Sequence, residues 1–283
     1  MVKNRVILVV LAHPDDETFG MGGTLALYAQ QGVEVDLVCA TRGEVGDVPE
    51  EMMEGYASVA ELREHELLEA TQIIGIKHVD FLNYRDSGMP GSPDNAHPQA
   101  LAAAPLDEVA GKVVQFIRKY KPQVVLTFDP IGGYRHPDHI AIQRATEKAF
   151  YAAGDSKFYP GEYPAFAPDK LYFHTMPKGM LRFGIFLMKF VGRDPHKFGR
   201  NGDIDLASIA EVSFPVNAVI NYLPVVEIRE AAAACHASQG GTQITGGGII
   251  GRIRRAFGAK DQFMRAYPPA TRHVERDLFE SIE

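Results

Sequence analysis

Hydrophobic and polar positions in the first half of the chain alternate between strand-like and helix-like patterns. Arg5–Ala12 is almost wholly apolar and β-branched, which is typical of a parallel strand covered on both faces. Further strands are predicted at Val33–Ala40, His78–Leu82 and Val124–Phe128. Helices are predicted at Thr24–Gln31, Ser58–Ile74, Leu106–Tyr120 and Asp138–Ala153. This order indicates an α/β fold with a Rossmann-like, doubly wound, mostly parallel sheet.

The expected strand order places two polar loops side by side. In a Rossmann-like order 3-2-1-4, the first and fourth strands are neighbours at the point where the winding reverses. Ligands bind beyond the carboxyl ends of strands at such a point. The loops that leave these two strands, His13–Thr18 and Asp129–His139, are the most polar in the chain. We therefore expect the functional site there.

The second half of the chain is less regular. Strands are predicted at Lys170–Thr175 and Glu211–Pro215, and a helix at Val225–Ala237. We interpret residues 1–283 as a single catalytic domain, with a core at 1–155 and an elaboration at 156–283. Two insertions are predicted within the elaboration, at 177–205 and 240–251.

Composition narrows the class of protein only modestly. The chain has 283 residues and a formal net charge of −7, which argues against a general nucleic-acid-binding protein. It shows neither a membrane-spanning apolar run nor a signal peptide pattern, and two cysteines do not make a disulfide framework. A cytoplasmic location is therefore expected, and a homo-oligomer is compatible with the sequence.

The segment His13-Pro14-Asp15-Asp16-Glu17 carries the strongest chemical signal. Four ionisable side chains follow directly on a buried strand. A solvated turn is the ordinary explanation of an Asp-Asp pair, but this pair faces the crevice of the sheet. Adjacent carboxylates there raise each other's pKa unless a cation lies between them. One carboxylate could bind a metal while the other acts on a water molecule.

The second signal is the segment Gly132-Gly133-Tyr134-Arg135-His136-Pro137-Asp138-His139. Its two histidines stand three residues apart at the start of a helix and so share roughly one side of the first turn. Such a pair alone is as often structural as functional. With the segment His13-Pro14-Asp15-Asp16 on the adjacent strand, it favours a shared metal site, because zinc hydrolases use three His or carboxylate ligands.

Together the two segments resemble the PIG-L/LmbE family of zinc-dependent N-deacetylases. Further segments are similar to the branch that acts in mycothiol biosynthesis and on mycothiol conjugates: Arg63 and its helix, Arg85–Met89, His236–Gln239 and Leu278–Ile282. The resemblance is good over residues 5–155 and loose over 206–283.

The resemblance implies a role for each matching residue. It implies that zinc, or alternatively ferrous iron, is bound by His13, Asp16 and His139. Catalytic roles fall to Asp15, His136, Asp138 and Tyr134. Asp15 would act as general base and then general acid, and His136 would stabilise the oxyanion. Asp138 would orient a histidine, and Tyr134 would polarise the substrate carbonyl. Substrate contacts are expected from Arg63, Asp86, Arg85 and His236.

The predicted function is hydrolysis of an N-acetyl group on an N-acetylglucosamine-type sugar or conjugate by zinc-bound water. An alternative within this chemistry is an amidase acting on thiol conjugates or other acylated amines. An alternative from another class is a Rossmann-like nucleotide-binding or sugar-binding protein without hydrolytic activity.

Residues 177–200 combine aromatic and aliphatic residues with lysines and arginines. A segment resting on anionic lipid has this composition, and so does a helix that caps an active site or forms an oligomer contact. Membrane contact is the less favoured of these interpretations.

Overall fold

A seven-stranded sheet forms the centre of the molecule in the computed structural model, which describes residues 4–197, 202, 205–244 and 258–282. The strand order is β3-β2-β1-β4-β5-β7-β6. The strands are β1 Val6–Leu11, β2 Glu34–Cys39, β3 His78–Phe81, β4 Val124–Phe128, β5 Lys170–Thr175, β6 Ala218–Asn221 and β7 Lys260–Tyr267. The first five pair in parallel, whereas β7 runs antiparallel to both of its neighbours. The predicted α/β class and the order 3-2-1-4 are confirmed.

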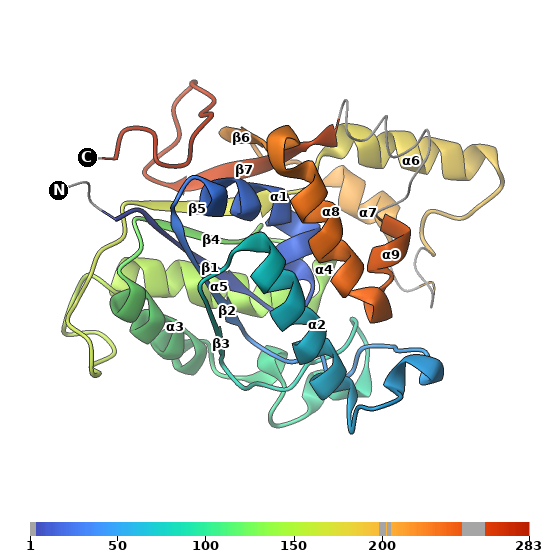
Figure 1. The fold of residues 1–283 in the computed structure, drawn as a ribbon, viewed down its shortest axis with the longest axis horizontal. Helices are drawn as coiled ribbons and strands as arrows, with labels where there is room; N and C mark the ends of the chain where they lie inside the picture. The colour runs from blue at the N-terminus through green and yellow to red at the C-terminus, as the bar shows by residue number, and fades with distance from the viewer. Residues whose placement is uncertain (1–3, 198–201, 203–204, 245–257, 283) are drawn as a thin grey trace.

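Helices cover the sheet in two groups (Figure 1). α1, α2 and α8 contact one another, and α3 packs against α5. This division follows from right-handed crossovers that wind outward in both directions from β1 and β4. The helices are α1 Asp16–Gln30, α2 Val59–Ile74, α3 Leu106–Tyr120, α4 Gly132–Arg135, α5 Pro137–Ala152, α6 Lys178–Phe190, α7 Leu206–Glu211, α8 Val226–Cys235 and α9 Gly241–Ile244.

Helix α1 begins eight residues before its predicted start at Thr24, directly after Asp15. The glycines at positions 20, 22 and 23 resemble a turn in sequence, but they lie inside this helix. At Gly23 the reason is close packing, because a Cβ there would come within 2.2 Å of the Tyr222 ring. A contact with a residue far along the chain thus requires glycine within a helix.

The second half of the chain differs from its prediction in two places. The strand predicted at Glu211–Pro215 is wrong, because α7 extends to Glu211 and the strand of this region is β6. The last strand in sequence, β7, was not predicted; it joins β5 and β6 from far along the chain. The strand predicted at Lys170–Thr175 is confirmed as β5.

The predicted insertion at 177–205 contains helix α6, and the one at 240–251 contains helix α9. Part of each insertion lies outside the described residues. Helix α6 projects at the edge of the molecule (Figure 1). One side of it and the residue after it expose large apolar side chains, namely Phe183, Phe186, Leu187, Phe190 and Val191. No helix among the described residues is long and apolar enough to cross a membrane.

A buried ionic network joins β5 and β7 to the end of the chain. Lys170 Nζ donates to Glu275 Oε1 at 2.7 Å, and Tyr172 donates to Glu275 Oε2 at 2.6 Å. Arg265 on β7 also donates to Glu275 Oε1, at 2.6 Å. Because Lys170 and Glu275 are both buried, each needs the charge of its partner.

We expect Glu275→Gln to lower the free energy of unfolding by about 3 kcal/mol, because it leaves the buried Lys170 ammonium without its counter-charge. Urea denaturation measures this difference. Glu69→Gln is the matched control, since the Glu69 ion pair with His65 is exposed and its loss changes stability by less than about 1 kcal/mol. Equal effects of the two substitutions would contradict the assigned role of the network.

Candidate active site

The carboxyl ends of β1 and β4 bring the two polar segments of the sequence together. β1 and β4 are adjacent and parallel, with Ile7 opposite Val124 and Val9 opposite Leu126. The chain leaves β1 into His13, and α1 begins at Asp16. It leaves β4 into α4, and α5 then begins with His136 as its N-cap residue. Both segments are therefore fixed by strand pairing on one side and by a helix start on the other.

The three side chains predicted to bind zinc, those of His13, Asp16 and His139, converge on one point. His13 Nδ1 lies 3.2 Å from His139 Nε2. The Asp16 carboxylate approaches both rings, at 3.6 Å from His13 Nδ1 and 3.3 Å from His139 Nε2. Ligands at 2.0–2.2 Å from a tetrahedral zinc ion are separated by about 3.3–3.6 Å. The spacing of these donors therefore fits a zinc ion. His136 adds a ring nitrogen within 4.8 Å of those of His13 and His139.

The charge around His13 also suits a cation. Burial lowers the pKa of His13, but the carboxylates of Asp86, Asp138 and Asp16 outweigh it and raise that pKa well above its ordinary value. Burial alone would raise the pKa of Asp16, yet His139 and His13 hold it well below its usual range. The cluster thus stabilises positive charge between buried acids, which is the environment that a divalent cation requires.

Asp138 holds His13 from the side opposite to His139. Its Oδ2 lies 3.1 Å from His13 Nε2 and also accepts a hydrogen bond from the Ser87 amide at 2.9 Å. The Ser87 hydroxyl donates to the other oxygen of Asp138. Because a carboxylate only accepts, it favours the tautomer of His13 with the proton on Nε2 and the lone pair on Nδ1. That lone pair faces His139 and Asp16.

His136 is held as a neutral hydrogen-bond donor. Its Nδ1 accepts the backbone amide of Asp138 at 3.2 Å, as a capping side chain of α5. Burial, followed by the neighbouring His13 and His139, lowers the pKa of His136 to about 3. In a neutral imidazole with Nδ1 as acceptor, Nε2 carries the proton. His136 can therefore donate from Nε2 to an oxygen atom.

Asp15 is paired with Arg63 rather than with a metal ligand. Arg63 Nη2 donates to Asp15 Oδ2 at 3.2 Å and to the Pro14 carbonyl at 2.8 Å, while Nη1 donates to the Gly43 carbonyl at 3.0 Å. Burial raises the pKa of Asp15 to about 7 against the opposing charge of Arg63. A carboxylate in this range can both accept and return a proton near neutral pH.

The backbone at Asp15 is strained. Its φ of 125° lies in a region that L-residues rarely adopt. Hydrogen bonds over-determine this geometry: the Asp15 amide donates to Glu17 Oε2 at 3.1 Å, and the Asp15 carbonyl accepts from Phe19 at 2.9 Å. Strain of this kind collects at functional sites, where the surrounding structure maintains it.

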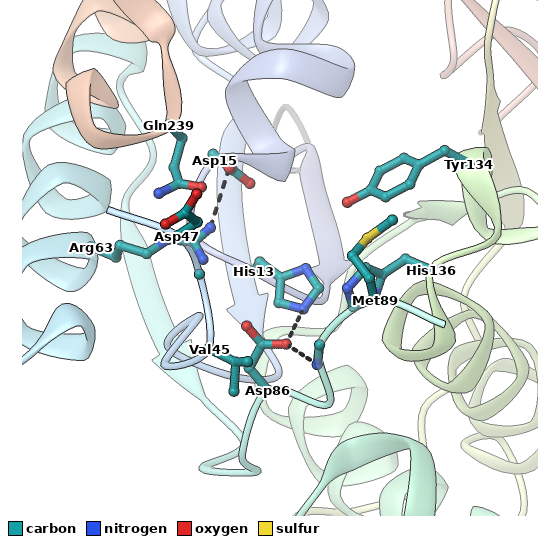
Figure 2. Close-up of a pocket in the computed structure, with 12 residues that line it drawn as sticks. His13, Asp15, Val45, Asp47, Arg63, Asp86, Met89, Tyr134, His136 and Gln239 are labelled. Atoms are coloured by element: carbon teal, nitrogen blue, oxygen red, sulfur yellow. Dashed lines mark hydrogen bonds and ion pairs between the residues drawn. The ribbon is translucent and has the colours of Figure 1, made fainter. Parts of the chain in front are cut away.

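A polar cavity of about 210 Å³ opens beside these groups. Figure 2 shows Asp15, Arg63 and Gln239 on one side of it, with Tyr134, His136 and Met89 on the other. Asp86 also lines it, accepts a hydrogen bond from the Gly88 amide at 2.8 Å and stands 3.5 Å from His13 Nε2. The Tyr134 ring extends toward the centre of the site (Figure 2).

Two residues predicted to contact the substrate lie elsewhere. Arg85 pairs with Asp94 at 2.7 Å and does not line the cavity. His236 is completely buried, and its Nε2 lies 2.8 Å from Glu17 Oε1. Each side chain is already engaged within the protein, so this geometry lends neither predicted contact support, and both stay predictions. Arg63 and Asp86, in contrast, do line the cavity.

Sequence reasoning missed two residues of this region. Glu17 links the Asp15 backbone to His236, a pairing across most of the chain that no local pattern indicates. Gln239 lines the polar cavity and donates to the Ser238 hydroxyl at 3.1 Å. Within the motif His236–Gln239, the glutamine reaches the cavity, whereas the histidine is buried.

The fold and the site define an α/β enzyme with a buried histidine–carboxylate centre, and comparisons with known proteins agree. The family described as PIG-L, GlcNAc-PI de-N-acetylase, matches residues 8–150. A 1D-myo-inositol 2-acetamido-2-deoxy-alpha-D-glucopyranoside deacetylase of Geodermatophilus obscurus is 36% identical over 84% of each chain. The enzyme of the same name from Acidothermus cellulolyticus is 35% identical over 99% of this chain and 96% of its own.

A solved structure has the same fold. The N,N'-diacetylchitobiose deacetylase of Pyrococcus horikoshii superposes with a TM-score of 0.61 at 21% identity, over 93% of this chain and 84% of its own. The chain belongs to the PIG-L family of de-N-acetylases. The predicted family and the predicted class of enzyme, a hydrolase that removes N-acetyl groups, are confirmed.

Backbone strain at Asp15 predicts an unusual order of stability. Glycine is tolerated better than alanine at any helix N-cap by up to about 1 kcal/mol. At position 15 we expect a larger difference, because only glycine adopts φ 125° without strain. The Asp15→Gly variant should be more stable than the Asp15→Ala variant by this ordinary N-cap difference plus about 1–2 kcal/mol. Urea denaturation of both variants gives the difference.

The control pair is Ser58→Gly and Ser58→Ala, because Ser58 is an N-cap residue with an extended backbone at φ −157°. If the difference between glycine and alanine were the same at Ser58 and at Asp15, the strain assigned to Asp15 would be absent.

Proposed function

We propose that this enzyme removes the acetyl group from a 2-acetamido-2-deoxy-glucoside, with a glucosamine joined to a polyol such as inositol as the preferred product. The names of its relatives support this substrate, since they are deacetylases of an inositol glycoside. The observation that carries the proposal is the polar cavity, at which His13, Asp15, Tyr134 and His136 all meet. Its Arg63, Asp47, Asp86 and Gln239 offer the donors and acceptors that sugar hydroxyls require.

We infer that zinc is the metal and that His13, Asp16 and His139 hold it. Two imidazoles and a carboxylate are typical of catalytic zinc sites, which leave a position open for water. A zinc ion held there would supply Lewis acidity, which lowers the pKa of water and polarises an amide carbonyl. The hydrogen bond from His13 Nε2 to Asp138 fits this assignment, because it leaves Nδ1 free to bind.

The remaining steps are assigned to the chain's own side chains. Asp15 takes a proton from the attacking water and returns it to the nitrogen of the leaving amine. Arg63 holds the Asp15 carboxylate in place during both transfers. His136 donates from Nε2 to the oxygen on which negative charge develops, and the Tyr134 hydroxyl, on the same side of the cavity, adds a second donor. Asp138 keeps His13 oriented throughout.

The decisive assay is amine release from N-acetylglucosaminyl inositol, N-acetylglucosamine and an N-acylated cysteinyl conjugate, each with and without a chelator. We expect the inositol glycoside to be hydrolysed with the highest kcat/KM, and the chelator to abolish turnover until zinc is restored. Faster hydrolysis of the cysteinyl conjugate would instead support the alternative amidase function. Tight nucleotide binding without amine release would support a non-hydrolytic protein.

Substitutions separate metal binding from proton transfer. We expect Asp15→Ala to retain one zinc per chain, measured by elemental analysis, while kcat falls about 10²- to 10⁴-fold. His13→Ala should lose both zinc and activity. His78→Ala is the control, because Glu34, Asp36 and His78 form a distant group that could also hold a metal, and it should keep both. Full activity of Asp15→Ala would refute the proton-transfer assignment.

A further inference from the structure

A second cavity adjoins the proposed catalytic centre and shares part of its wall with the polar cavity. It has a volume of about 360 Å³ and shares Asp15 and Tyr134 with the polar cavity. Asp16 and His139, two of the proposed zinc ligands, also lie on its wall. The two cavities therefore meet at the position where the amide bond is hydrolysed.

The walls of this second cavity are mainly apolar. Its apolar side chains come from α1, β4, the segment after β5 and the residue after β6, and they include Phe19, Phe128, Met176, Pro177 and Tyr222. His174 also lines it, and burial lowers the pKa of His174 to about 4, so that the ring is uncharged at neutral pH. The polar cavity, in contrast, is lined by Arg63, Asp47 and Asp86.

Three charged residues lie on the second cavity as well, Arg229, Lys260 and Asp261. The Asp261 carboxylate is engaged by α1, since its Oδ2 accepts the Thr24 amide at 2.9 Å and the Thr24 hydroxyl at 2.7 Å. Burial raises the pKa of Asp261 to about 6. Because these three residues carry charge, a test of the cavity has to compare an acidic ligand with uncharged ones.

We propose that the apolar cavity is an acyl-binding site and that the enzyme hydrolyses N-acyl amino sugars with chains longer than acetyl. This inference rests on the proposed function. The carbonyl carbon of an amide carries the amine on one side and the acyl chain on the other. If the sugar amine occupies the polar cavity, the acyl chain points into the apolar one. A methyl group is about as large as one water molecule, ~30 Å³, and would leave most of the space unfilled.

The chemistry is the same for every chain length. Water adds its oxygen to the carbonyl carbon, and the bond from that carbon to nitrogen breaks. The products are a carboxylate and an ammonium group: Asp15 passes one water proton to the nitrogen as the bond breaks, and the second water proton is transferred to the amine when the carboxylic acid ionises. No further reactant is needed, so only the fit of the chain distinguishes one substrate from another.

The test is a series of N-acylated glucosamines carrying acetyl, propionyl, butyryl and hexanoyl groups, with N-succinylglucosamine as an acidic comparison. Free glucosamine is measured, and kcat/KM is determined for each substrate. We expect kcat/KM to rise about threefold to fourfold per added methylene until the cavity is filled, because each methylene leaves water for an apolar wall. The N-succinyl compound should react more slowly than the N-butyryl compound.

Two methionine substitutions locate the effect. Met176→Trp narrows the apolar cavity and should shift the ratio of hexanoyl to acetyl hydrolysis at least tenfold toward acetyl. Met89→Trp narrows the polar cavity instead, and it should lower kcat/KM for all chain lengths by a similar factor. If Met176→Trp fails to fold, the dependence of the native enzyme on chain length decides alone.

The outcomes separate this inference from the function beneath it. Hydrolysis of N-acetylglucosamine with a steady decline on every added methylene would overturn the acyl site and leave the deacetylase function intact. Absence of hydrolysis for all N-acyl sugars would overturn the proposed function itself. A faster reaction with the N-succinyl compound, or a gain from alkyl groups on the sugar's anomeric oxygen instead of on the acyl group, would also contradict the acyl site.

Discussion

The parallel pairing of β1 with β4 is the constraint on which the site depends. Their register, with Leu8 opposite Val125, makes the two strands end at the same edge of the sheet. His13 and His139 are far apart in sequence but reach 3.2 Å between ring nitrogens, because His13 directly follows β1 and the short helix α4 leads the chain from β4 to His139 at the start of α5. The loops carry the reactive side chains, whereas strand pairing brings these side chains within contact distance of one another.

Charge within the site follows from this geometry. Asp86 and Asp138 are buried beside His13, where unpaired carboxylates would be costly, and the partly buried Asp16 approaches the same ring. A cation held between the donors, as proposed, would offset that cost, and the same arrangement sets Asp15 apart with Arg63 as its partner. In the proposed mechanism, metal binding and proton transfer therefore fall to adjacent residues, because one carboxylate faces the histidines and the other faces the guanidinium.

Local patterns predicted the core of the fold and the position of the site. The apolar runs of β1 and β4 and the caps of α2 and α5 are local features, so their bounds follow from sequence. The early start of α1 does not, because Gly23 is explained only by the Tyr222 ring. Likewise the engagement of His236 by Glu17 depends on packing between distant segments, which a motif cannot reveal.

The most direct test of this account is the location of the metal in crystals of the purified enzyme, by anomalous scattering at the zinc edge. The account predicts one peak about 2.0–2.2 Å from His13 Nδ1, His139 Nε2 and an Asp16 oxygen. A peak instead at Glu34, Asp36 and His78, in an enzyme that hydrolyses N-acetyl groups, would contradict the account. So would an active enzyme with no metal between the two histidines.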